Sequence, residues 1–100
     1  MTSSHYSLER QERENLIEKI GYGNIIKSVV VDRGHINGPE IHNISDTGII
    51  TIYNQRTHKL ITKLIARPGQ IERYYTNGER IPQNLIKIAQ NHQRLSMNYA

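Results

Sequence analysis

The chain has 100 residues, of which 36% are hydrophobic, and it carries a formal net charge of +4. This length predicts one domain over residues 1–100, with a modest core of Ile, Val and Leu because Phe and Trp are absent. The absence of Cys excludes disulfide bonds and thiol chemistry, and no apolar run approaches the roughly 20 residues that span a membrane.

The N-terminal part of the chain predicts a tail and a helix. Residues 1–6 are expected to form a disordered tail, and Ser7 is the candidate N-cap of a helix over residues 7–20. The helix carries a narrow apolar stripe on an otherwise charged surface. This stripe consists of Leu16, Ile17 and Ile20. We expect the stripe to pack on a sheet, with the binding of a partner as the alternative.

A sheet is predicted over residues 25–66. The β-branched run at residues 25–32 predicts its first strand, and three consecutive valines in it indicate a central strand that is buried on both faces. Three more β-prone runs follow a loop that contains two glycines. These runs are Glu40–Ser45, Gly48–Asn54 and Lys59–Ala66. The short linkers between them predict hairpins and therefore a β-meander.

Two prolines mark the C-terminal helices, because proline is favoured at the first helical position. Pro68 precedes a short helix that ends near Tyr75, and Pro82 begins a final helix over residues 82–96. The order of elements predicts an α+β fold. We expect a four-stranded, mostly antiparallel sheet with the N-terminal and C-terminal helices on one face and an open opposite face.

The register of the meander determines which side chains share a face. A two-residue loop at residues 46–47 and a four-residue loop at residues 55–58 give the simplest register. The polar face then carries Glu40, His42, Thr51, Tyr53 and Thr62, and the buried face carries Ile41, Ile50, Ile52, Ile61 and Ile65. Lys63 would project from the buried face, so it either extends to the edge of the sheet or indicates a different register. A three-residue second loop would place Ile61 beside Thr51.

Part of the chain resembles a known family. The runs GHINGPEIHNIS, GIITIYN and LIARPGQIERYY, within residues 25–75, resemble the minimal nuclease domains of the barnase–EndoU–colicin–RelE superfamily. The resemblance implies a metal-independent endoribonuclease of the toxin or effector type, with RNA as substrate, no cofactor, and an antitoxin or immunity protein as partner. Its site would lie on the open sheet face. The positions that match are His42, Thr51, Tyr53, Arg67, Arg73 and Tyr74.

Metal-independent cleavage of RNA needs a base for the 2′-hydroxyl, a cation for the phosphorane and an acid for the leaving 5′-oxygen. His42 is the acid–base candidate because imidazole titrates near neutrality, and Glu40 would either tune the pKa of His42 or serve as the second acid–base group. Arg67 suits the transition-state charge because guanidinium binds phosphate through two hydrogen bonds. The remaining catalytic candidates are Thr51, Tyr53 and, in the glycine-rich loop, His35. The candidates for contacting nucleic acid are Arg33, Lys63, Arg73 and Tyr74.

The sequence leaves other interpretations open. A histidine on a strand is more often a hydrogen-bonded structural residue than a catalyst, and Arg67 could instead pair with Glu72. His35, Glu40 and His42 match no strong metal-binding motif, so no metal site is predicted. The rival function is a non-catalytic module, encoded by a phage or plasmid, that binds nucleic acid or inhibits a host enzyme. A homodimer formed by pairing of sheet edges is a third possibility. The absence of a signal-peptide segment predicts a cytoplasmic protein.

Overall fold

The computed structural model describes residues 10–98, and side chains as far as residue 95. The tail predicted at residues 1–6 and the cap predicted at Ser7 lie outside the described residues. The elements in chain order are α1 (Arg10–Ile20), β1 (Ile25–Val31), β2 (Glu40–Ser45), β3 (Ile49–Asn54), β4 (Leu60–Ile65), α2 (Pro68–Tyr74) and α3 (Gln83–Asn98). The predicted α+β class is confirmed, with an antiparallel four-stranded meander in the order β1-β2-β3-β4.

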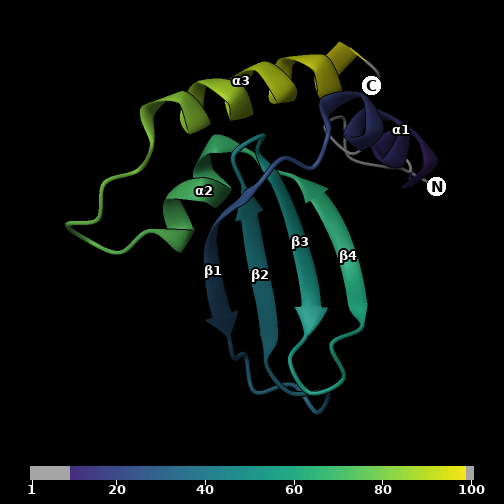
Figure 1. The fold of residues 1–100 in the computed structure, drawn as a ribbon, viewed down its shortest axis with the longest axis vertical. Coiled ribbons are helices and arrows are strands. Elements are labelled where there is room, and N and C mark those ends of the chain that lie inside the picture. The colour runs from purple at the N-terminus through teal and green to yellow at the C-terminus, as the bar shows by residue number, and fades with distance from the viewer. Residues whose placement is uncertain (1–9, 99–100) are drawn as a thin grey trace.

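The helices gather at one end of the sheet, near the β2–β3 hairpin, and leave the opposite end of the strands uncovered (Figure 1). Helix α1 contacts β4, while α2 and α3 contact each other. The main core lies between these two C-terminal helices and one face of the sheet. Its buried members are Ile44, Ile50, Ile52, Ala66, Ile71, Leu85 and Ala89. We call this side of the sheet the helix face.

The prediction that β1 is a central strand is wrong, because β1 lies at an edge of the sheet. Val30 is 56% exposed, while Val29 and Val31 on the other side of the strand are half-buried. A run of valines fits any pleated, half-buried surface, so it indicates a strand without indicating burial on both faces.

The predicted register of the β2–β3 hairpin is also wrong. Ile44 lies opposite Ile50, which leaves the three residues 46–48 as the loop beyond Ser45 and Ile49. Gly48 has a φ of 82°, and its N–H donates to the Ser45 carbonyl at 3.1 Å. A left-handed glycine at the third loop position is typical of three-residue hairpins. The additional loop residue shifts the pairing of β3 by one position. Each side chain of β3 therefore lies on the face of the sheet opposite to the predicted one.

The second hairpin has the predicted four-residue loop but a different register beyond it. The Asn54 N–H donates to the Lys59 carbonyl at 2.9 Å, as that loop requires. A bulge then places Tyr53 opposite Leu60 but Ile52 opposite Thr62. The additional residue in β4 is Ile61, which is 47% exposed rather than buried as predicted. One inserted residue offsets the whole remainder of the strand.

A salt bridge joins the segment between α2 and α3 to the edge strand β1. Lys27 Nζ lies 2.8 Å from Glu79 Oε2 and 4.7 Å from the centre of the Tyr75 ring. The Thr76 N–H and hydroxyl both donate to Glu79 Oε1 at 2.8 Å. The hydrogen bond from Lys27, followed by those from Thr76, lowers the pKa of Glu79 from 4.5 to about 2.

This lowered pKa predicts that acid weakens the fold through Glu79. The carboxylate contributes its full stabilisation above its unfolded pKa of 4.5, and the contribution is lost as the pH falls through about 2. Urea unfolding between pH 5 and pH 2 should therefore show a larger loss of stability for the wild-type chain than for Glu79→Gln. Parallel curves for the two proteins would contradict the role of this carboxylate.

Candidate functional site

Three side chains form a hydrogen-bonded chain on the helix face of the sheet. His42, at the middle of β2, is only 2% exposed. Its Nε2 lies 3.0 Å from Glu40 Oε1, and its Nδ1 lies 2.5 Å from the Tyr74 hydroxyl. Glu40 and His42 are two residues apart on one strand and therefore share a face, while Tyr74 reaches them from the last turn of α2. We call these three residues the Tyr–His–Glu relay.

The chemistry of the partners fixes the direction of the two hydrogen bonds for a neutral imidazole. A carboxylate can only accept, so Nε2 carries the proton that is donated to Glu40. Nδ1 is then the acceptor, and the Tyr74 hydroxyl donates to it. This is the order of groups by which a carboxylate and an imidazole draw a proton from a hydroxyl.

The relay lines one side of a hollow with a volume of about 430 Å³. Arg33, two residues beyond β1, and Arg73, from α2, also line this hollow, together with Thr62 of β4. Burial raises the pKa of the Tyr74 hydroxyl, and Glu40 raises it too, while Arg33 and Arg73 act in the opposite direction. Tyr74 is therefore a neutral hydroxyl in a site with two guanidinium groups. We call this hollow the relay hollow.

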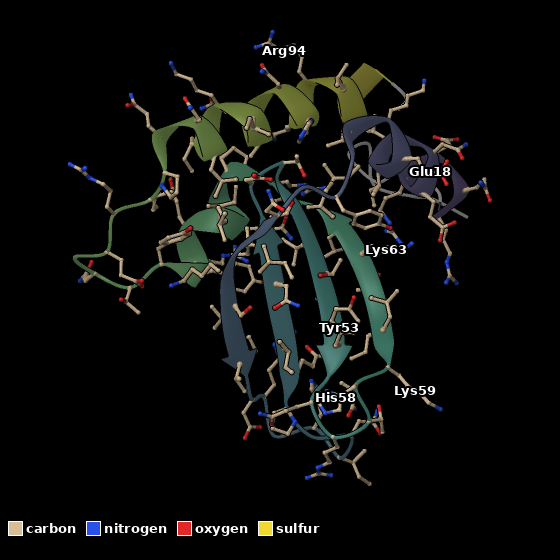
Figure 2. All side chains as sticks on the ribbon, viewed as in Figure 1. Glu18, Tyr53, His58, Lys59, Lys63 and Arg94 are labelled. Carbon is tan, nitrogen blue, oxygen red and sulfur yellow. The ribbon has the colours of Figure 1, made fainter. Side chains whose placement is uncertain are left out.

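Some of the residues predicted to form a site lie on the opposite face. His42 pairs with Ile52, so the neighbouring Thr51 and Tyr53 of β3 cannot share its face: both point away from it. Lys63 pairs with Thr51 and is on that side as well. Figure 2 shows Lys63 near α1, the helix that carries Glu18. The predicted cluster of His42 with Thr51 and Tyr53 is therefore wrong, because the first hairpin has one more loop residue than expected.

The helix face nevertheless holds most of the other candidates. Glu40, His42 and Thr62 share one face, as predicted. That face was expected to be open, but α2 covers part of it. Arg67 precedes α2, where its N–H donates to Gln70 Oε1 at 2.9 Å, and it does not line the relay hollow. His35 is exposed in the β1–β2 loop and does not line it either.

The pairing of His42 with Tyr74 could not be found from the sequence. Tyr74 was a candidate for contacting nucleic acid, but nothing in the spacing of residues 42 and 74 indicates a hydrogen bond between them. No sequence pattern points to Gln70, which also lines the relay hollow. In the part of the chain that the structure describes, no group of three or more His, Asp or Glu residues is arranged to hold a metal ion.

Comparison of the chain with protein-family models, with curated proteins and with solved structures found no match. Among residues 10–98, no helix is both long enough and apolar enough to cross a membrane. Any functional conclusion therefore depends on the chemistry of the site.

Proposed function

We propose that the protein is a metal-independent endoribonuclease that cleaves RNA by activating its 2′-hydroxyl. The observation that carries the proposal is the Tyr–His–Glu relay in a hollow that two arginines line. Both ring nitrogens of the buried His42 have a hydrogen-bond partner, so its burial leaves no ring nitrogen unpaired. The same arrangement is useful where a proton has to be moved from a bound hydroxyl.

The two arginines supply the groups that a phosphodiester requires. Arg33 and Arg73 lie on the same hollow as the Tyr74 hydroxyl. Guanidinium groups bind phosphate oxygens through paired, charge-assisted hydrogen bonds and stabilise the extra charge of a phosphorane. The proposal therefore places the scissile phosphate between these arginines and the 2′-hydroxyl against Tyr74.

The relay gives a direct route for the proton. As the 2′-oxygen attacks the phosphorus, Tyr74 Oη accepts the 2′-hydroxyl proton and passes its own proton to His42 Nδ1. The Glu40 carboxylate stabilises the imidazolium that results. The bond from phosphorus to the 5′-oxygen breaks, and the leaving oxygen takes a proton from water. The products are a 2′,3′-cyclic phosphate and a 5′-hydroxyl, and His42 then returns its proton to solvent.

The proposal is tested with a labelled RNA of mixed sequence in the presence of EDTA. We expect the wild-type chain to cleave it, and His42→Gln to be slower by about 10²–10⁴-fold, because proton transfer by a positioned side chain contributes about that factor. The carboxamide retains hydrogen-bonding atoms inside the fold but does not titrate near neutral pH.

His35→Ala is the control for this experiment, because it removes an exposed imidazole outside the relay hollow. We expect it to cleave at the wild-type rate. Intact RNA with the wild-type chain, in solution and with ribosomes added, would contradict the proposal. Salt-sensitive binding without cleavage would instead support a non-catalytic module that binds nucleic acid.

A further inference from the structure

A second hollow adjoins the relay hollow beside α2, and one residue of α3 also lines it. It has a volume of about 360 Å³ and is lined by Arg67, Pro68, Gly69, Gln70, Arg73 and Gln93. Gln70 and Arg73 line both hollows, so the two hollows are neighbours. We call it the flanking hollow.

The lining of the flanking hollow suits an anionic ligand. Its described lining residues combine two guanidinium groups with two carboxamides and include no carboxylate. Gln70 Oε1 already accepts the Arg67 N–H, which leaves the amino group of that carboxamide as a donor. Positive charge and N–H donors suit a phosphate, whose oxygens accept charge-assisted hydrogen bonds.

The spacing of the two arginines suits consecutive phosphates of one strand. Arg67 immediately precedes α2 and Arg73 lies in its last turn. Six residues of α-helix advance roughly 9 Å along the axis. Long, flexible side chains at the two ends can bind neighbouring phosphates over this distance.

On the opposite face of the sheet, the described residues form a less basic hollow. Among the described residues that line this hollow, Lys63 is the basic one, and Tyr22 lines the same hollow. The Tyr22 hydroxyl raises the pKa of Lys63, and the carboxylates of Glu14 and Glu18 raise it further. Those carboxylates would repel a phosphate at the same place.

We propose that single-stranded RNA extends from the relay hollow over Arg73 into the flanking hollow, where Arg67 binds the phosphate next to the scissile one. This inference depends on the proposed function for its substrate class. It adds that the protein recognises a strand longer than a dinucleotide, and it gives Arg67 a binding role outside the reacting centre.

The test measures binding of 2′-O-methyl oligonucleotides, which cannot be cleaved, by fluorescence anisotropy over a range of salt concentrations. We expect the wild-type chain to bind a tetranucleotide about tenfold more tightly than a dinucleotide, because one more charge-assisted contact is made. Arg67→Gln should lose this length advantage, keep the dinucleotide affinity, and show a salt slope lower by about 1. The control Lys63→Gln should retain the length advantage.

An unchanged length advantage in Arg67→Gln would overturn the inference, and so would the absence of a length advantage in the wild-type chain. The two proposals fail separately. Cleavage of RNA, with a binding affinity that does not depend on oligonucleotide length, would support the proposed function and contradict the flanking site. Length-dependent binding that requires Arg67, in a protein that does not cleave RNA, would support the flanking site and contradict the proposed function.

Discussion

Tyr74→Phe is expected to lower the rate of RNA cleavage by about 10²–10⁴-fold while the fold is retained. The substitution removes only the hydroxyl oxygen that joins the relay hollow to His42 Nδ1. His42 keeps its hydrogen bond to Glu40 at 3.0 Å but has no hydroxyl from which to draw a proton. The loss should appear in kcat rather than in KM, because the hydroxyl acts in the transition state.

The same substitution has a predictable effect on stability. It leaves a buried ring nitrogen without its partner, which costs about 1–3 kcal/mol. Circular dichroism and urea unfolding would confirm that the variant is folded under assay conditions. The matched control is Tyr53→Phe, which removes the same atom from the opposite face. Equal losses in the two variants would contradict the assignment of the site to the helix face.

Gly23→Ala is expected to destabilise the protein by roughly 2–5 kcal/mol. Gly23 has a φ of 65°, and a Cβ there would overlap Asp46 Oδ1 and lie 2.8 Å from Thr47 Cγ2. Those side chains cannot move freely, because Asp46 accepts the Asn24 N–H at 3.0 Å and Thr47 Oγ1 donates to the Gly21 carbonyl at 2.7 Å. The left-handed backbone contributes about 1–2 kcal/mol of the expected loss and the overlap about 1–3 kcal/mol.

Gly21→Ala separates these two contributions. Gly21 also has a positive φ, of 85°, but a Cβ added to it would have no neighbouring atom within 4 Å. We therefore expect Gly21→Ala to lower the free energy of unfolding only by the cost of the left-handed backbone, about 1–2 kcal/mol. Urea unfolding of both variants measures the difference. Equal losses at the two positions would show that the close approach of Gly23 to the β2–β3 hairpin does not contribute to stability.

The sequence predicted the elements well because most of their signals are local. Prolines at residues 68 and 82 mark the first residues of the two C-terminal helices to within one residue. The β-branched runs mark all four strands. The first hairpin also carries a readable signal. Gly48 follows Asp46-Thr47, and a glycine at the third loop position favours a three-residue turn over a two-residue one. A register based on that glycine places His42 opposite Ile52, as the structure does.

Other features of the site could not be predicted because they depend on distant parts of the chain. The bulge at Ile61 has no glycine or proline to mark it. The contact between His42 and Tyr74 joins residues 32 positions apart and exists only because α2 packs over β2. Of the two explanations offered for Lys63, the structure has the different register. The direction of the Lys63 side chain depends on the bulge, which the sequence does not mark.

The most direct test of the central claim uses a DNA oligonucleotide with one ribonucleotide, incubated with the wild-type chain in EDTA. The relay mechanism predicts a single cut immediately after the ribonucleotide, giving a 2′,3′-cyclic phosphate and a 5′-hydroxyl, and almost no cut with Tyr74→Phe. Cleavage at deoxyribonucleotides, or an equal rate with Tyr74→Phe, would contradict 2′-hydroxyl activation by the Tyr–His–Glu relay.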